Sequence, residues 1–253
     1  MHKFPSVSDP QGLVYDPVAE AYERGRTAWP AAIAEGIAGE TVLDLAAGTG
    51  KLTRVLVERF PHVIAVEPLA AMREVGVRLV PGAEWLDGTA EALPLPDASV
   101  DAAFVADAFH WFDAVTAAAE LARVIRPGGT LVVVFAVFEG GFEPDLTDDA
   151  VVAVRTVSRR TGRTGAPKVE SGEWRAGFAG APFGELEERE LAFGHVTDRE
   201  GVISYYLSMS TVAARPQSER DELAATLREL LPDAEHRVRV RALSYRAERL
   251  PSP

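Results

Sequence analysis

The sequence predicts an α/β fold built on a doubly wound, mostly parallel sheet, and two observations support this. From residue 41 onward, short apolar runs alternate with segments whose apolar residues recur at helical spacing, such as Leu52, Val55 and Leu56. The run Thr130–Phe138 is nearly continuous in apolar and β-branched residues, as expected of a strand covered on both faces. Strands that alternate with helices form βαβ units, whose strands lie parallel in one sheet.

The expected elements follow this alternation along the chain. Strands are predicted at Thr41–Leu45, His62–Val66, Glu84–Leu86, Asp101–Ala106, Thr130–Phe138, Leu186–His195 and His236–Arg246. Helices are predicted from Gly50, from about Ala70, and over Ala114–Ile125, Arg199–Met209 and Pro216–Leu231. A short N-terminal helix is expected to begin at Pro17, capped by Asp16, and to end near Arg26. Residues 158–172 are polar and contain Gly and Pro, which predicts a loop.

The composition is typical of one domain with a smaller cap. Of the 253 residues, 47% are hydrophobic, which is enough to bury one core. No stretch approaches the roughly 20 uninterrupted apolar residues of a membrane span, and the N-terminus lacks the apolar core of a signal peptide. We therefore expect a cytoplasmic protein with no membrane partner. Cysteine is absent, which excludes disulfides, thiolate nucleophiles and Cys-based metal sites.

The charge pattern argues against a nucleic-acid partner. The formal net charge of −12 repels polyanions, and a nucleic-acid enzyme needs a basic surface. Only three of the 26 basic residues are lysine, and the excess of Arg and Ala indicates a bacterial, high-GC source. Arg237, Arg239 and Arg241 alternate with apolar residues, so they are expected on one solvated sheet face. The five histidines are too scattered to predict a metal site.

The segment VLDLAAGTGKLT, residues 42–53, is the strongest local signal for a ligand site. An apolar strand runs into the small-residue turn AAGTG, and the predicted helix follows at once. Small residues let the backbone approach a ligand, and a helix N-terminus offers free N–H groups. A P-loop fits poorly, because Leu45 and Leu52 replace its first glycine and its hydroxyl residue. A nicotinamide-type turn also fits poorly, because Thr53 replaces the third glycine.

Two carboxylates flank this turn. Asp44 lies inside an otherwise apolar strand end, where a buried carboxylate needs a partner. That partner is a ligand amine or the backbone N–H groups of the turn, and the two roles can coexist. Glu67 ends the second strand, in VIAVEP, where a carboxylate can accept both hydroxyls of a ribose. The alternative for Glu67 is a solvated residue at a strand end.

Four ordered motifs make the sequence resemble a known family. VLDLAAGTGKLT, VIAVEP, GTAEALPLPDASVDAAFVADAFHWFD and RVIRPGGTLVVV occur in the order and spacing of class I S-adenosylmethionine-dependent methyltransferases. The chain looks most like the methyltransferase type 11 branch related to ubiquinone-biosynthesis and trans-aconitate methyltransferases, whose members often carry an AFHWF run. The match covers roughly residues 12–138. The resemblance implies a Rossmann-like, seven-stranded sheet with an antiparallel final strand, and S-adenosyl-L-methionine as the cofactor.

The resemblance also implies roles for single residues. The position of Asp44 helps to hold the methionine portion of the cofactor through its ammonium, and Glu67 holds the ribose hydroxyls. The adenine borders the GTAE segment, with the Ala90 N–H facing a ring nitrogen. Ala46 stands where many relatives have Gly, which suggests a tighter turn, and Thr89 replaces a frequent Asp, which removes an acceptor for the adenine amino group. The complete set predicted to bind the cofactor is Tyr22, Arg26, Asp44, Ala46, Gly48, Gly50, Glu67, Pro68, Thr89, Ala90, Glu91 and Ala106.

Two groups of residues are candidates to face the substrate. Ligands of open α/β sheets sit beyond the carboxyl ends of the strands, so His110 is either a base or substrate contact, or a structural histidine bonded to backbone. Trp111 is expected in the core or in the wall of the cofactor pocket. Tyr22 and Arg26 share one face of the N-terminal helix. Arg26 is expected to meet the cofactor carboxylate or an acidic substrate group, with Tyr22 lining the lid; the alternative is surface packing.

The sequence therefore predicts three segments and one function. Residues 1–40 form an N-terminal cap, residues 41–138 the cofactor-binding core, and residues 139–253 the rest of the core with a cap insertion at about 198–231. The cap is expected to close over a mostly apolar pocket. The expected reaction is methyl transfer to an O, N or C nucleophile of a small metabolite, without metal, by a monomer or homodimer. The alternatives are a nicotinamide-dependent reductase and a non-catalytic S-adenosylmethionine-binding module.

Overall fold

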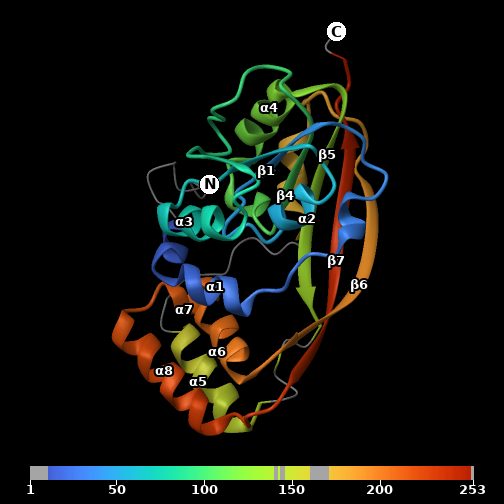
Figure 1. The fold of residues 1–253 in the computed structure, drawn as a ribbon. Coiled ribbons are helices and arrows are strands. Elements are labelled where there is room, and N and C mark those ends of the chain that lie inside the picture. Colours follow the sequence, from blue (N-terminus) through green and yellow to red (C-terminus); the bar gives the residue numbers. More distant parts are fainter. Residues whose placement is uncertain (1–10, 140–141, 143–145, 160–170, 252–253) are drawn as a thin grey trace, which may run out of the picture.

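The computed structural model, which describes residues 11–139, 142, 146–159 and 171–251, is centred on a seven-stranded sheet. The strand order is β3-β2-β1-β4-β5-β7-β6 (Figure 1). The strands are β1 (Thr41–Leu45), β2 (His62–Val66), β3 (Glu84–Leu86), β4 (Val100–Ala106), β5 (Ile125–Phe138), β6 (Glu187–Thr197) and β7 (His236–Glu248). Strands β1 to β5 run parallel, whereas β7 runs antiparallel to both β5 and β6. The predicted doubly wound sheet with an antiparallel final strand is confirmed.

The helices fall into two groups (Figure 1). Beside the sheet lie α2 (Thr53–Val57), α3 (Ala70–Leu79) and α4 (Ala114–Val124). Toward one end of the sheet lie α1 (Ala19–Gly25), α5 (Asp148–Arg159), α6 (Arg199–Leu207), α7 (Ser210–Ala213) and α8 (Gln217–Leu230), which together are called the cap. Short 3₁₀ helices cover Gln11–Val18, Ala31–Ala34, Phe109–Trp111 and Glu173–Phe178.

The predicted strands are all present, but several of their ends differ from the prediction. The largest difference is at β5, which begins at Ile125, the residue predicted to end a helix. Ile125 pairs with Val100 of β4 and is 1% exposed. Burial in the sheet therefore determines its conformation, and α4 ends one residue earlier at Val124.

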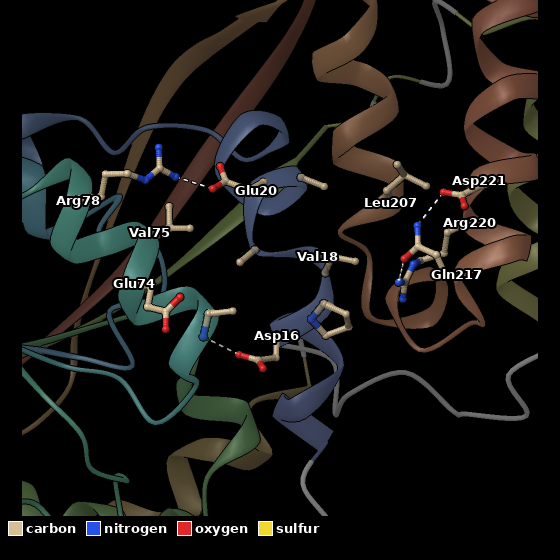
Figure 2. Close-up of a pocket in the computed structure, with 14 residues that line it drawn as sticks. Asp16, Val18, Glu20, Glu74, Val75, Arg78, Leu207, Gln217, Arg220 and Asp221 are labelled. Carbon is tan, nitrogen blue, oxygen red and sulfur yellow. Dashed lines mark hydrogen bonds and ion pairs between the residues drawn. The ribbon is translucent and has the colours of Figure 1, made fainter.

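The N-terminal helical segment also differs from its prediction. Pro17 lies inside the 3₁₀ helix and α1 begins only at Ala19, so Asp16 does not cap it. Instead, the N–H of Ala71 donates to Asp16 Oδ1 at 2.8 Å, and Asp16 caps the start of α3 (Figure 2). Local spacing could not reveal this partner, because it lies 55 residues further along the chain.

Two other helices differ from the sequence prediction. Helix α2 begins at Thr53 rather than Gly50, because the chain is still in a turn through Leu52. Helix α5 was not predicted at all, and it extends to Arg159, inside the segment predicted as a loop. Residues 160–170 of that loop lie outside the described residues. Helix α5 buries Ala150 and Val154 in the cap.

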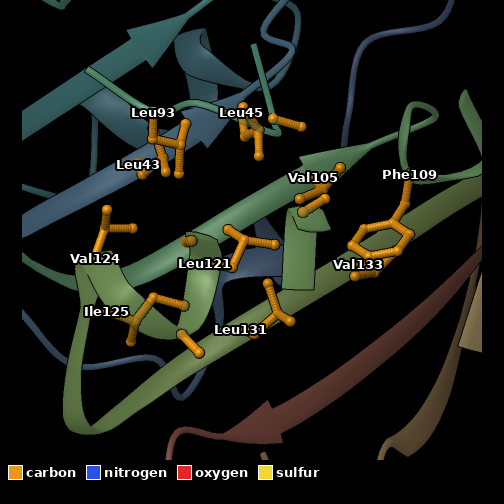
Figure 3. Packing of buried hydrophobic residues seen from close by; sticks show 14 of the residues in the cluster. Leu43, Leu45, Leu93, Val105, Phe109, Leu121, Val124, Ile125, Leu131 and Val133 are labelled. Atoms are coloured by element: carbon orange, nitrogen blue, oxygen red, sulfur yellow. The ribbon is translucent and has the colours of Figure 1, made fainter. Parts of the chain in front are cut away.

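Both faces of the sheet are covered, because alternate residues of the central strands enter two apolar layers. One layer, with α4, includes Leu43, Val105, Leu121, Leu131 and Val133 (Figure 3). The other layer includes Ile33, Val42, Leu56, Phe104 and Val132. Each fully buried aliphatic side chain contributes about 1.5–3 kcal/mol to folding. With both faces filled, the ends of the strands are the place left for a ligand.

The cap has an apolar cluster of its own. It includes Ile203, Tyr206, Leu223, Leu227 and Val240. Because Val240 belongs to β7, this cluster is continuous with the sheet. No helix in the described part of the chain has the length and apolar character needed to cross a membrane.

Candidate active site

The carboxyl ends of β1, β2 and β4 lie next to one another at the end of the sheet that faces α1 (Figure 1). Strands β2 and β3 lie on one side of β1 in the sheet, and β4 and β5 lie on its other side. Strand order therefore reverses between β1 and β4, which is where open α/β sheets bind ligands. Leu45 pairs with Val66 on one side and with Val105 on the other, so Glu67 and Ala106 flank Ala46 from the two neighbouring strands.

The small-residue turn after β1 uses left-handed backbone conformations. The angle φ is 54° at Ala46, 58° at Gly48 and 84° at Gly50. Glycine adopts such angles without strain, whereas alanine there costs of order 1 kcal/mol. A Cβ added to Gly50 would lie 3.0 Å from Val80 Cγ2, so packing also favours glycine at that position. Ala46 is therefore a strained residue at the candidate site.

Glu67 holds this turn from the end of β2. The N–H of Gly48 donates to Glu67 Oε2 at 2.8 Å, and the N–H of Leu69 donates to Oε1 at 2.9 Å. Glu67 is 4% exposed, which excludes the solvated alternative, while Pro68 beside it is exposed. Burial raises the pKa of Glu67 to about 7, although both N–H bonds and the nearby Arg73 favour the charged form.

Asp44 is buried beneath the turn. It is 1% exposed, and the Thr53 hydroxyl donates to Asp44 Oδ2 at 2.6 Å. Burial raises the pKa of Asp44 to about 7, and the bonds from the Thr53 hydroxyl and N–H oppose that rise. Asp44 therefore ties β1 to the first residue of α2. This hydroxyl partner was not anticipated from the sequence.

Tyr22 lies on α1 beside the turn and Arg26 directly follows the helix, and both are partly buried. Tyr22 Cε1 lies 4.0 Å from the position of a Cβ on Gly48. Arg26 donates through Nε to the Ser208 hydroxyl at 3.0 Å and through Nη2 to the Ser208 carbonyl at 2.9 Å. Its guanidinium carbon is 5.4 Å from the ring centre of Tyr22 and 5.1 Å from that of Tyr205. Arg26 thus joins α1 to the end of α6.

Glu23 connects α1 to the turn directly, and it was not predicted. Thr49 donates its hydroxyl to Glu23 Oε2 at 2.6 Å, and Arg54 Nη2 donates to Oε1 at 2.9 Å. Lys51 Nζ lies 3.5 Å from the same Oε1. The partners are at least 26 residues away in sequence, so no local pattern could identify them.

The loop after β3, which was predicted to border an adenine, is held against the start of α4. Thr89 is exposed and Ala90 is 3% exposed. Glu91 Oε1 accepts from the N–H of Asp113 at 3.0 Å, and Asp113 in turn caps α4. These bonds hold the loop Thr89–Glu91, which forms the rim of the candidate site.

His110 lies in the 3₁₀ turn after β4. Its ring centre is 5.8 Å from that of Phe135 and 4.9 Å from that of Trp111. Among the described residues, its buried Nδ1 has no hydrogen-bond partner, so the alternative of a backbone-bonded histidine has no support at this atom. Burial lowers the pKa of His110 to about 4, so the ring is neutral at pH 7.

Comparison with known proteins identifies the family. Residues 43–133, from β1 into β5, match a family model described as a methyltransferase domain. An uncharacterized methyltransferase of Mycobacterium tuberculosis is 35% identical over 225 residues, which cover 87% of this chain and 86% of the relative. The chain belongs to the methyltransferase family.

Two further likenesses agree with this. An uncharacterized methyltransferase-like protein of Schizosaccharomyces pombe is 32% identical over 219 residues, or 83% of this chain and 82% of the relative. A solved structure assigned as a type II methyltransferase of Anaeromyxobacter dehalogenans has a TM-score of 0.65 and 28% identity, covering 90% of this chain and 99% of that one. The predicted class I methyltransferase and its fold are confirmed.

The methyltransferase has one more carboxylate at the strand ends, partly buried, that sequence reasoning did not single out. Asp107 follows β4 with φ of 51°, and the N–H of Ala136 donates to its Oδ1 at 2.7 Å. Burial raises the pKa of Asp107 to about 6, while the bond from Ala136 and the charge of Arg26 oppose the rise. The sequence did carry a signal: an acidic residue directly after an apolar strand, as at Glu67.

A surface cleft of about 510 Å³ lies elsewhere on the methyltransferase, between α1, α3 and α8 (Figure 2). Its lining includes Asp16, Glu20, Glu74, Arg78 and Asp221. None of the residues predicted to bind the cofactor lines this cleft. The candidate active site is therefore the region at the strand ends beneath α1, where those residues meet.

Proposed function

We propose that this methyltransferase transfers the methyl group of S-adenosyl-L-methionine to an O, N or C nucleophile of a small metabolite. One arrangement carries the proposal: the left-handed turn with Gly48 and Gly50, flanked by the buried carboxylates of Asp44 and Glu67. This arrangement lies at the switch point of the sheet, beneath α1, and within the segment that matches the family model.

Glu67 is proposed to bind the ribose hydroxyls. Each of its oxygens accepts one backbone N–H and keeps a second lone pair, so both can accept a hydroxyl without releasing the turn. The adenine would then lie along the rim made by Pro68 and the loop Thr89–Glu91, with the Ala90 N–H as a donor. The residues that approach the cofactor through their backbone are Ala46, Gly48, Gly50 and Ala106.

The methionine portion would point toward α1. Arg26 is held by Ser208 through Nε and Nη2, which leaves Nη1 available for the methionine carboxylate. Tyr22 would cover the same end, because it already packs against the turn. Asp44 supports the floor of this region through its bond with Thr53.

The chemistry needs little from the protein beyond orientation and exclusion of water. When bound, the cofactor supplies a methyl group on a positively charged sulfur, which is activated for in-line displacement and leaves S-adenosyl-L-homocysteine. Helix α1 would shield the site from water, and correct positioning accounts for much of such a rate enhancement. A nucleophile that carries a proton also needs a base. His110 is proposed for that role, because its neutral ring has a buried nitrogen without a partner in the described structure.

A small acceptor is favoured over a polymer. The net charge of −12 opposes the approach of nucleic acid. Helix α1 is bonded to the turn through Glu23 and covers the proposed site from that side, which would hinder the entry of a polymer chain. We expect a bacterial, cytoplasmic enzyme that works as a monomer or homodimer. Light scattering of the purified protein would test the oligomeric state.

Two measurements test the proposal. Titration calorimetry should detect binding of S-adenosylhomocysteine and none of NAD⁺ or NADPH; the reverse result would support a reductase. A panel of small acceptors with methyl-labelled S-adenosylmethionine should then yield labelled product. Tight binding without turnover across a broad panel would favour a non-catalytic binding module.

A further inference from the structure

We propose that the outer edge of β6 pairs with the same edge of a second copy of this chain, giving a symmetric dimer with one continuous sheet. The inference does not depend on the proposed function, because β6 is the strand at the far side of the sheet from the glycine turn. It also gives a role to the alternating arginines Arg237, Arg239 and Arg241, which the proposed reaction does not use.

The backbone edge of β6 is the first observation. Strand β6 is the last in the sheet order, and among the described residues β7 is the one strand that pairs with it (Figure 1). Its 11 residues, Glu187–Thr197, all pair with β7 without a bulge, and none is proline. Proteins commonly protect an open strand edge with proline, bulges or charge. Here only charge is used, and only at Glu187–Glu190, so the segment Leu191–Val196 is unprotected.

The two faces of this unprotected segment differ. Leu191 and Phe193 are partly buried against an apolar layer of the sheet. Ala192, Gly194 and Val196 point to the opposite, exposed face. A further strand beside β6 would cover Leu191 and Phe193 from the side that is now open, and it would meet small side chains on the exposed face.

Strand β7 makes this exposed face positive. Arg239 lies beside Gly194, and Arg237 lies beside Val196, in the register of the two strands. Their side chains are 78% and 72% exposed, and the ion pairs that they form within the chain are at the surface, where such pairs contribute little. Among the described residues, no atom lies within 4 Å of a Cβ position on Gly194. A long acidic side chain could therefore reach Arg239 across it.

The first half of β6 carries the complementary charge. Glu188 and Glu190 lie on the same exposed face, because side chains alternate along a strand. They are two residues apart, as are Arg237 and Arg239. Within its own chain, Glu190 is 3.1 Å from Arg241, so a glutamate of β6 and an arginine of β7 already meet on this face.

One antiparallel alignment matches these charges. A copy of β6 paired over its full length has its two-fold axis at Ala192, with the partner's Glu190 opposite Gly194 and the partner's Glu188 opposite Val196. Each partner carboxylate then starts two strands, or about 10 Å, from an arginine of β7. Glutamate and arginine side chains together span that gap. Each acidic pair therefore faces two arginines, twice in the dimer.

The same alignment opposes no like charges. Every acidic residue of one β6 stands opposite an uncharged residue of the other. Arg189 stands opposite the partner's His195, and burial lowers the pKa of His195, so its ring is neutral at pH 7. On the partly buried face, Leu191 meets the partner's Phe193. A second copy of this chain thus fits the edge in charge and in polarity.

Cysteine cross-linking tests the pairing, because the chain has no cysteine of its own. Ala192→Cys would place two thiols on the two-fold axis, where opposed Cα atoms are about 4.5–5.5 Å apart, within the range of disulfides. Mild oxidation should convert most of this variant to a covalent dimer. Val115→Cys, at a position on α4 that is 65% exposed, is the matched control and should cross-link far more slowly. Val196→Cys should behave like the control, because its two copies would lie about 26 Å apart.

Sedimentation equilibrium measures the association without a covalent bond. The wild type should dimerise with a micromolar dissociation constant. Ala192→Glu lies beside Arg241 in its own chain, so the fold should tolerate it, but it places two carboxylates opposite each other in the dimer. Its dissociation constant should rise at least about 10-fold, with an unchanged circular dichroism spectrum. Val115→Glu should associate like the wild type.

Three results would overturn the proposal. The first is equal cross-linking of Ala192→Cys and Val115→Cys, or a wild type that stays monomeric up to about 200 μM. The second is efficient cross-linking of Val196→Cys instead of Ala192→Cys, which would refute this register and the role of the arginines. The third is a monomer that binds hexaglutamate through Arg237 and Arg239, which would assign the surface to an acidic peptide.

Discussion

The carboxylate of Glu23 and the hydroxyl of Thr49 are joined by a 2.6 Å hydrogen bond, although 26 residues separate them. Glu23 belongs to α1 and Thr49 to the glycine turn, so this bond connects the lid helix to the proposed cofactor site. Arg54 donates to the same carboxylate. Movement of α1 away from the turn must break these contacts, which leads to the first prediction.

Glu23→Gln should speed the release of S-adenosylhomocysteine. The amide loses the charge that holds Arg54 and Lys51, so α1 should open more readily. We expect the dissociation rate in stopped-flow experiments to rise roughly 3- to 10-fold, equivalent to about 1 kcal/mol. The control is Glu20→Gln, which removes an exposed ion pair with Arg78 and should leave the rate unchanged. Equal effects of both variants would contradict the role of Glu23.

Gly25→Ala should destabilise the fold because α1 and α6 cross at this residue. A Cβ on Gly25 would lie 2.1 Å from the backbone nitrogen of Tyr205, a clash that only a backbone shift can relieve. We expect the free energy of unfolding in urea to fall by roughly 2–3 kcal/mol. Gly82→Ala is the matched control, because no atom lies within 4 Å of its Cβ position. A stability equal to that of the control would show that the helices can separate freely.

Asp44→Asn should change how stability depends on pH. Burial raises the pKa of Asp44 to about 7, so its favourable contribution is complete below the unfolded value near 4 and is lost as pH rises through 7. Asparagine does not titrate, so the variant does not lose stability in this way as pH rises. Its unfolding free energy relative to the wild type should therefore increase from pH 4 to pH 8, by up to about 4 kcal/mol. A difference that stays constant over this range would show that Asp44 does not titrate abnormally.

Glu67→Ala should weaken cofactor binding by roughly 1–3 kcal/mol, the range for hydrogen bonds to charged groups. The substitution also leaves the N–H groups of Gly48 and Leu69 without their acceptor, so the melting temperature should fall as well. Glu58→Ala, at an exposed position after α2, provides the control for calorimetry with S-adenosylhomocysteine. An unchanged affinity would remove Glu67 from the ribose site.

His110→Ala separates a base from a scaffold once an acceptor has been found in the panel. If His110 removes the proton, kcat should fall by at least about 100-fold while affinity for S-adenosylhomocysteine is unchanged. Burial lowers the pKa of His110 to about 4, and the pH dependence of the rate therefore provides a second criterion. The ring is already neutral above that pH, so the wild-type rate should show no step near pH 6.5. A retained rate in the variant would leave His110 with a packing role only.

The strands were predictable because their signal is local. Runs such as Thr41–Leu45 and His62–Val66 are apolar over the length of a strand and end in small or acidic residues, and the structure has strands with these same limits. Covering the sheet on both faces requires such runs, so the fold class follows from the pattern alone. Glu67 was predicted as a candidate site residue for the same reason. It directly follows an apolar strand, where burying a carboxylate costs the most free energy.

The connections between distant segments were not predictable. Asp16 was read as a local helix cap, but its partner is Ala71, and the contacts of Glu23 are equally remote. Helix α5 is the exception, because it carries a local signal that was overlooked: Asp148 and Asp149 lie in its first turn, and Ala150 and Val154 share one buried face. One sequence records which residues are apolar or charged, but it does not record which distant backbone group each charge will meet.

The packing of α1 on α6 has a consequence for biosynthesis. Arg26 near the start of the chain is bonded to Ser208, 182 residues later. A nascent polypeptide that has emerged from the ribosome only as far as β5 has neither α6 nor the antiparallel β7, so α1 can contact the glycine turn and α3 but not its partner in α6. The bond between Arg26 and Ser208 that joins α1 to α6 can therefore form only after Ser208 has been synthesised, and products that end earlier should lack it.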